Sequence, residues 1–148
     1  MTQGAQQYRI LFLDCGAGIG GSSTFLRYLL SHLDRKKFEP FVAFYFYNDG
    51  PDTEKMRTLG AKVIFLNKNQ EPTDYVQIKF LLGTSKWKWW QKAKVVLRLG
   101  LRLTIVDIPL IRRLVSVLKK EAISLVLLNN HVGTHLAGVV AARLAGVP

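Results

Sequence analysis

Short apolar runs alternate with helical patterns along the whole chain. The runs predict four strands, over residues 9–14, 41–47, 62–66 and 123–128. The first run, from Ile10 to Leu13, is continuous rather than alternating, which is typical of a parallel strand covered on both faces. The second is rich in aromatic residues, which favour sheet positions.

Helical spacing of apolar residues fills the intervals between these strands. It predicts helices over residues 22–33 and 52–59, the second stopped by Gly60. Residues 75–121 are mostly helical in pattern with breaks near Gly83 and Pro109, and a last helix, marked by Leu136, Val139, Val140 and Leu144, ends at Gly146. Strands separated by helices, without an internal repeat, predict a parallel sheet with right-handed crossovers. We therefore expect an α/β fold, a Rossmann-like doubly wound sheet forming one domain over residues 1–148.

Composition narrows the class of protein. The 148 residues suit a single domain, and a hydrophobic content of 49% excludes wholesale disorder. The only cysteine, Cys15, permits no internal disulfide and fits a reducing, cytoplasmic setting; we interpret it as a small residue at a strand end rather than a reactive thiol. Residues 1–9 are polar and predict no secretory signal. The uncharged stretch 122–142 contains Asn, His and Gly, so it predicts a strand, loop and helix rather than a membrane span.

A glycine-rich loop joins the first strand to the first helix. Residues 14–23 read DCGAGIGGSS, and Ser22 or Ser23 is placed to cap the helix that follows. Backbone without Cβ atoms, next to the positive end of a helix, lets a phosphate or a sugar hydroxyl approach closely. We expect the ligand site here.

The glycine spacing leaves three interpretations open. Gly16, Gly18 and Gly21 also satisfy the dinucleotide-binding pattern, which asks for an acidic residue about 20 positions later to hold the ribose. Glu39 precedes the predicted second strand, and Asp49 lies 28 residues beyond Gly21, after that strand has ended. We therefore prefer a different phosphate or sugar site to an NAD site or to a purely structural turn.

The net charge of +11 is concentrated in one part of the chain. Residues 79–113 contain nine Lys or Arg residues and one acid, Asp107, and so carry +8. On a helical wheel the cations of residues 86–102 fall on one arc and most of the apolar residues on the other, which suits an anionic membrane surface. The expected membrane-binding residues are Lys86, Trp87, Lys88, Trp89, Trp90, Lys92, Lys94, Arg98 and Arg102.

Two other interpretations of this basic segment remain. It could be a solvated helix whose tryptophans pack on the sheet, or a nucleic-acid-binding surface. No nucleic-acid-binding module is recognisable in the sequence, so nucleic acid is not an expected partner.

Several motifs follow one another at a characteristic spacing: residues 9–13 followed by Gly20-Gly21-Ser22, the strand at 41–43 with its Gly50-Pro51 turn, residues 59–63, residues 125–130 followed by His131, and the closing residues 141–148. In the order and spacing of these motifs, the chain resembles the N-terminal domain of GT-B glycosyltransferases, the large retaining, nucleotide-sugar-dependent family that includes mannosyl- and glucosyltransferases. The resemblance covers nearly the whole chain.

The resemblance implies an acceptor-binding half of an enzyme that transfers a sugar from a nucleotide-sugar donor to an acceptor hydroxyl, on a glycan or a lipid-linked molecule. It assigns substrate contacts to Gly20, Gly21, Ser22, Asn129, Asn130 and His131. His131 is the candidate for a catalytic role, and its other interpretation is an ordinary loop residue. His131 and His135 have helical spacing, but no third ligand accompanies them, so we expect no metal and no cofactor beyond the donor.

The same resemblance implies that the chain stops before the last strands of the domain and before the C-terminal domain that holds the nucleotide sugar. We therefore expect the isolated chain to be inactive, and its location to be cytoplasmic and peripheral on the membrane. Two alternative functions stay open: an NAD(P)-binding domain of an oxidoreductase, and a basic membrane-binding module without chemistry.

Overall fold

The computed structural model describes residues 7–14, 21–47, 49–67, 107–129 and 136–148. Its centre is a four-stranded sheet in which every strand pair is parallel. The strands, in the spatial order β3-β2-β1-β4, are β1 (Tyr8–Asp14), β2 (Phe38–Phe44), β3 (Lys62–Phe65) and β4 (Leu125–Leu128). All four strands predicted from the sequence are present.

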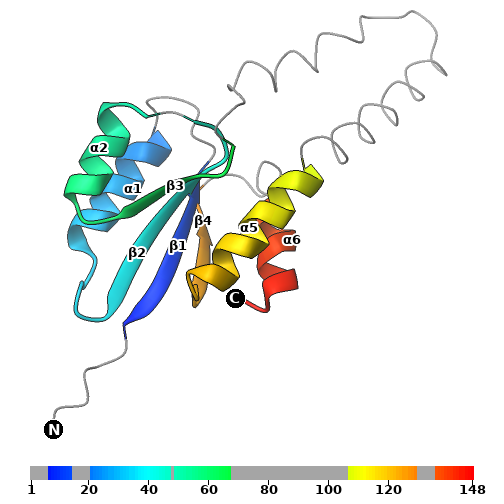
Figure 1. Cartoon of the computed structure of the whole chain (residues 1–148). Helices are drawn as coiled ribbons and strands as arrows, with labels where there is room; N and C mark the ends of the chain where they lie inside the picture. The colour runs from blue at the N-terminus through cyan, green and yellow to red at the C-terminus, as the bar shows by residue number, and fades with distance from the viewer. Residues whose placement is uncertain (1–6, 15–20, 48, 68–106, 130–135) are drawn as a thin grey trace, which may run out of the picture.

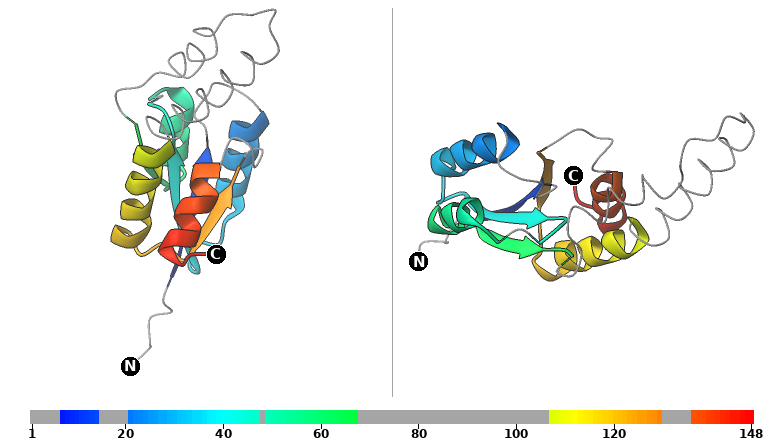
Figure 2. Two further views of the ribbon diagram at one scale, coloured as in Figure 1. Left: turned by 90° about the vertical axis from the view of Figure 1, so that its right-hand side faces the viewer. Right: turned by 90° about the horizontal axis from the view of Figure 1, so that it is seen from above.

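Helices cover both faces of this sheet. The described helices are α1 (Gly21–His32), α2 (Pro51–Thr58), α5 (Ile108–Lys120) and α6 (Leu136–Ala145). Figure 1 shows α1 and α2 on one side of the strands and α5 and α6 on the other, and the view from above in Figure 2 shows the same three layers. The predicted α/β, Rossmann-like doubly wound fold is confirmed.

Two apolar cores form because successive strand residues point to opposite faces. Ile10 and Phe12 of β1 pack with the buried Leu26 and Leu30 of α1. Leu11 and Leu13 belong to the second core, which includes Leu114 and Leu118 of α5 and Ala137 and Ala141 of α6. Full burial of one such leucine stabilises the fold by about 2 kcal/mol. The continuous apolar run of β1 thus has the physical cause that the sequence indicated.

The second strand begins and ends three residues earlier than predicted. Phe38, Glu39 and Pro40 pair with Tyr8, Arg9 and Ile10 of β1, so the prediction of a strand over residues 41–47 was wrong at both ends. Pro40 has no N–H for a sheet, but β3 pairs with β2 only from Phe41 onward. The proline therefore lies where the sheet has a neighbour on one side alone.

The other boundaries differ by one or two residues at their described ends. Pro109 stands in the first turn of α5, where a proline is tolerated, so the predicted break falls at the start of this helix. The fourth strand begins at Leu125 instead of Ile123, because the N–H of Ile123 donates to Leu118 O (2.9 Å) and closes the end of α5. Residues 68–106, with the predicted helical pattern and the break near Gly83, are outside the described part.

Three described helices end in the same pair of backbone hydrogen bonds. After α2, Gly60 N–H donates to Arg57 O and Ala61 N–H to Met56 O; the same pattern follows α6 at Gly146 and α5 at Ala122. This arrangement places its middle residue in the left-handed region, with φ of +78° at Gly60, +71° at Gly146 and +47° at Ala122. Glycine adopts this conformation freely, whereas alanine is strained by its Cβ.

We therefore expect Ala122→Gly to raise the free energy of unfolding by about 1 kcal/mol, since it removes that strain at an exposed position. Gly60→Ala should lower it by about 1 kcal/mol for the opposite reason. Urea unfolding of both variants measures the two signs. A destabilised Ala122→Gly variant would contradict the assignment.

Candidate functional site

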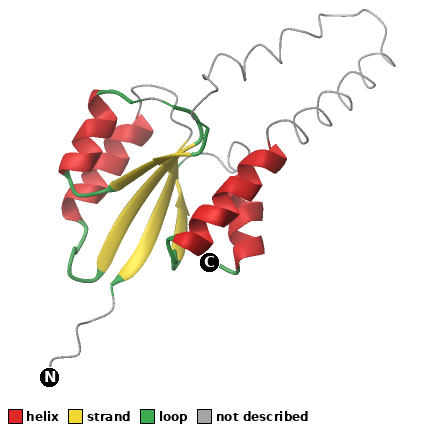
Figure 3. Cartoon of the chain, in the orientation of Figure 1, coloured by secondary structure: helices red, strands yellow, loops and turns green. Residues whose placement is uncertain are grey.

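The order in which successive strands are added to the sheet reverses between β1 and β4. From β1 the chain proceeds through α1 to β2 and through α2 to β3, whereas β4 lies on the other side of β1. In doubly wound sheets, ligands bind outside the carboxyl ends of the strands at such a reversal. Because the strands are parallel, their carboxyl ends lie together at the same end of the sheet (Figure 3). The site is therefore expected where β1, α1 and β4 meet.

The side chain of Asn129 joins these three elements. Its Nδ2 donates to Asp14 Oδ2 at the end of β1 (2.7 Å) and to the backbone carbonyl of Ser22 in the first turn of α1 (3.0 Å). Its backbone N–H donates to Leu13 O (3.0 Å) and extends the ladder between β4 and β1. Since both side-chain neighbours are acceptors, the amide nitrogen must face them, and no residue in the described ranges donates a hydrogen bond to Oδ1, which we consider the group available to a ligand.

Asp14 is the member of this site that the sequence did not single out. It is only 3% exposed, and its backbone carbonyl accepts a hydrogen bond from Tyr45 N–H (3.1 Å), which ties it to the end of β2. A buried carboxylate is stabilised by donated hydrogen bonds and by the positive end of a nearby helix. An acid directly after a buried apolar strand was the available signal for it.

Gly21 opens α1 and is exposed. Its φ lies outside the left-handed region, and a Cβ built on it meets no atom of the described residues within 4 Å. Neither the backbone conformation nor packing among these residues therefore requires glycine at this position. A requirement for glycine would have to come from a molecule that approaches the backbone there.

The structure brings three predicted site residues together: Gly21 and Ser22 in α1, and Asn129 from the loop after β4. The predicted site residues Gly20, Asn130 and His131 lie outside the described residues, as do Cys15 and His135. The same holds for the whole predicted membrane segment: Lys86, Trp87, Lys88, Trp89, Trp90, Lys92, Lys94, Arg98 and Arg102. Within the described ranges no group of three or more His, Cys, Asp or Glu could hold a metal ion.

Glu39 does not lie where a ribose-binding acid would be needed. The expectation that it precedes the second strand was wrong: it lies within β2, opposite Arg9, near the amino end of the strand. Its carboxylate pairs with Arg9 Nε (2.9 Å) and Lys62 Nζ (2.6 Å), and the hydrogen bond from Lys62 is the main cause of its lowered pKa. Glu39 therefore links three strands near their amino ends, remote from the site.

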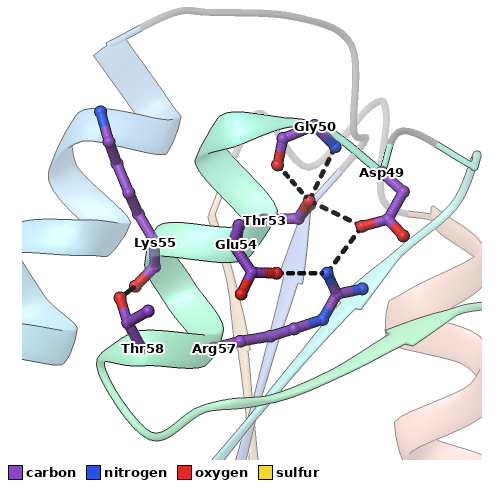
Figure 4. A network of polar contacts seen from close by, with 7 residues as sticks. All are labelled: Asp49, Gly50, Thr53, Glu54, Lys55, Arg57 and Thr58. Atoms are coloured by element: carbon purple, nitrogen blue, oxygen red, sulfur yellow. Dashed lines mark hydrogen bonds and ion pairs between the residues drawn. The ribbon is translucent and has the colours of Figure 1, made fainter.

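Asp49 follows the carboxyl end of β2, the end of the sheet at which a ribose-binding acid would be needed, but its carboxylate is bound by residues of α2 (Figure 4). Its Oδ1 accepts a hydrogen bond from Arg57 Nη1 (2.7 Å), which lowers the pKa of the carboxyl group, and lies 3.1 Å from Thr53 Oγ1. Thr53 Oγ1 also accepts the N–H of Gly50 (2.9 Å), and Arg57 contacts Glu54 (3.1 Å). This network fixes the first turn of α2 and uses the acid that a dinucleotide site would need.

Helix α6 packs closely against the strand residues that directly precede Asp14 and Asn129. Gly138 is buried, and a Cβ on it would overlap Leu13 Cδ2 and lie 3.1 Å from Leu128 Cδ2 and 3.2 Å from Tyr45 Oη. Leu13 and Leu128 directly precede Asp14 and Asn129, the residues joined by the hydrogen bond across the site. The helical spacing of apolar residues in this segment did not indicate this role for Gly138.

The described groups at this edge suit a ligand that carries hydroxyl groups. Asn129 Oδ1 is an acceptor, Ser22 is half-buried and offers a hydroxyl, and the first N–H groups of α1 have no acceptor four residues earlier within the helix. Comparison of the chain with protein-family models, with curated proteins and with solved structures gives no match.

Proposed function

We propose that this domain is the acceptor-binding half of a glycosyltransferase that moves a sugar from a nucleotide-sugar donor to an acceptor hydroxyl. The observation that carries the proposal is the Asn129 bridge, the pair of hydrogen bonds by which Asn129 joins Asp14 and Ser22, at the place where the strand order reverses. It holds the start of α1 beside the loop after β4, the two segments that the family resemblance assigns to the acceptor. A second domain would contribute the donor.

The electrostatics of the bridge favour a hydroxyl over a phosphate next to Asn129. Asp14 Oδ2 is 2.7 Å from Asn129 Nδ2, so a phosphate that approached the amide would approach a carboxylate as well. A hydroxyl can donate to Asn129 Oδ1 and accept from the N–H groups of α1 without that repulsion. Since both candidate ribose acids are held in ion pairs, the contacts also favour a saccharide over NAD.

The direct test is a titration of the ¹⁵N-labelled chain with saccharides, followed through the backbone amides of Gly21 and Ser22 and the side-chain amide of Asn129. We expect a hydroxyl-rich saccharide to shift these resonances. Gly21→Val should abolish the shifts, because its added atoms occupy the open space beside α1, while the free energy of unfolding changes by less than about 1 kcal/mol.

NADH is the control ligand in this titration. Shifts of the same amides by NADH, with the saccharides silent, would replace the proposal with an oxidoreductase domain. Absence of any shift with saccharides and NADH alike would remove the assignment of an acceptor site.

We further propose that the acceptor is lipid-linked and that the protein reaches it by docking on an anionic membrane from its cytoplasmic side. The support is the +8 charge of residues 79–113 and the three tryptophans at 87, 89 and 90, all of which are features of the sequence. No helix in the described ranges combines the length and apolarity needed to cross a bilayer.

Docking of this kind has a defined salt dependence. Five wheel-aligned cations contribute on the order of 5 kcal/mol at low salt, and screening reduces this as salt is added. We expect co-sedimentation with vesicles containing anionic lipid, weakening with salt and lost when Lys88, Lys92 and Lys94 are replaced by Glu. Equal sedimentation with neutral and anionic vesicles would contradict the electrostatic part of the proposal, and none with either would end it.

A further inference from the structure

The outer face of α1, opposite the face that packs on the sheet, carries a row of aromatic residues. With about 3.6 residues per turn, Gly21, Phe25, Tyr28 and His32 follow one another along one side of the helix, and all four are exposed. Phe25 is 53% and Tyr28 65% exposed, and neither belongs to the two apolar cores. The row therefore begins at Gly21, where we place the ligand, and continues away from it along α1.

Two of these rings are held in a fixed arrangement. The ring centroids of Tyr28 and His32 lie 4.3 Å apart, with 38° between the ring planes. His32 Nδ1 lies 2.9 Å from the backbone carbonyl of Tyr28 and 2.9 Å from Ser31 Oγ, so turning the imidazole would break these contacts. Binding to a preformed surface costs less side-chain ordering, and this pair of rings is therefore suited to receive a ligand.

Hydroxyl groups flank the aromatic row, and the row itself contains no Lys, Arg, Asp or Glu. Thr24 and Ser31 are exposed on one side of it, and the half-buried Ser22 lies on the other. Arg27, the only cation of α1 besides the terminal histidine, contacts Asp52 of α2 through Nη1 (3.1 Å). Aromatic rings beside hydroxyl groups suit a saccharide, whose C–H faces pack on the rings and whose hydroxyls bond to the flanking groups. An anionic membrane would require cations on this face.

We infer that the outer face of α1 is a platform for an acceptor oligosaccharide, whose reacting end lies at Gly21 and whose further sugar rings stack on Phe25, Tyr28 and His32. The platform is about 16 Å long, from the rise of an α-helix over these residues, and so accommodates several linked sugar rings. This inference rests on the proposed function, because it extends the same acceptor site. It specifies the substrate as a saccharide chain rather than a single sugar.

The test compares linear tetrasaccharides of mannose and of glucose with their monosaccharides in an amide titration of the full chain. We expect a tetrasaccharide and its monosaccharide both to shift the amides of Gly21 and Ser22. The tetrasaccharide alone should also shift the amides of Phe25, Tyr28 and His32. It should bind about tenfold more tightly than the monosaccharide, which is the gain that stacking on the rings can supply.

Single substitutions separate the platform from Gly21. Phe25→Ala and Tyr28→Ala should each remove most of the tenfold gain and leave monosaccharide binding unchanged, and the helix should persist because alanine favours it. Tyr28→Phe, which keeps the ring, should bind like the unsubstituted chain. Tyr8→Ala is the matched control, since Tyr8 is 61% exposed at the amino end of β1, and it should change neither affinity.

The outcomes separate this inference from the proposed function. Equal affinities for tetrasaccharide and monosaccharide, with shifts confined to Gly21, Ser22 and Asn129, would overturn the platform and leave the proposed function standing. Shifts at Tyr28 and His32 alone would contradict the proposed function as well as the continuity of the platform with it. Sedimentation of the chain as a dimer that Phe25→Ala dissociates would show that a second copy covers this face, and would overturn the inference.

Discussion

Asn129→Asp is expected to lower the free energy of unfolding by about 3 kcal/mol at neutral pH. The substitution replaces an amide donor with a second carboxylate beside Asp14, which is 3% exposed and has its Oδ2 2.7 Å from the substituted atom. Two carboxylates at this separation repel, and the Ser22 carbonyl loses its donor as well. Urea unfolding at pH 7 measures the loss.

The loss should depend on pH in a defined direction. Repulsion raises the pKa of the introduced carboxyl group in the folded state above its value in the unfolded chain, so the substitution costs little at low pH and opposes folding as pH rises. The deficit of Asn129→Asp should therefore shrink toward pH 3 and grow from pH 4 to 7. A deficit independent of pH would mean that lost packing, and not charge, is responsible.

Asn67→Asp is the matched control. Asn67 Oδ1 accepts a hydrogen bond from Arg113 Nη1 (2.9 Å), so the same substitution there places a carboxylate beside a cation. We expect a change of less than about 1 kcal/mol, with stability equal or slightly higher at neutral pH. Destabilisation of this variant comparable to that of Asn129→Asp would show that the amide, rather than the neighbouring charge, decides the effect.

The local signals in the sequence predicted the fold because each strand and helix carries its own pattern. Gly60 and Gly146 ended their helices as expected, both with positive φ. A boundary was predicted wrongly where it depends on pairing between strands. Phe38 belongs to β2 because it pairs with Tyr8, a partner 30 positions earlier that no local pattern reveals.

Gly21, Ser22 and Asn129 were assigned to a site from the sequence, but the hydrogen bonds that join Asn129 to the start of α1 and to the end of β1 were not predicted. Asn129 was expected to contact the acceptor, yet its amide Nδ2 donates to Asp14 and to Ser22 within the protein, so Oδ1 is the atom that we propose contacts a ligand. This bridge spans 115 residues and depends on the register of β1 and β4, so composition and spacing could not indicate it. The acids Glu39 and Asp49 looked available in the sequence because their cationic partners are set by the sheet and by α2.

Gly138→Val is expected to lower the free energy of unfolding by about 3 kcal/mol, at the upper end of the range for overpacked cores. Its Cβ would overlap Leu13 Cδ2, which ends a flexible side chain, but Leu13 is fully buried, so moving this methyl group disturbs its packed neighbours. Leu128 and Tyr45 lie within 3.1 and 3.2 Å of the same atom, so α6 must shift outward. Gly138→Ala should show a smaller loss in the same direction.

Gly21→Val should reduce saccharide binding without reducing stability, so it distinguishes an effect on the site from an effect on the fold. A shift of α6 displaces Leu13 and Leu128, and with them the Asp14 and Asn129 ends of the bridge, so Gly138→Val should lose stability and saccharide binding together. Gly21→Val adds bulk where no described atom is near and should lose binding alone. Urea unfolding and the amide titration, applied to both variants, measure the two effects separately. Full binding by a destabilised Gly138→Val variant would show that the packing of α6 does not position the bridge.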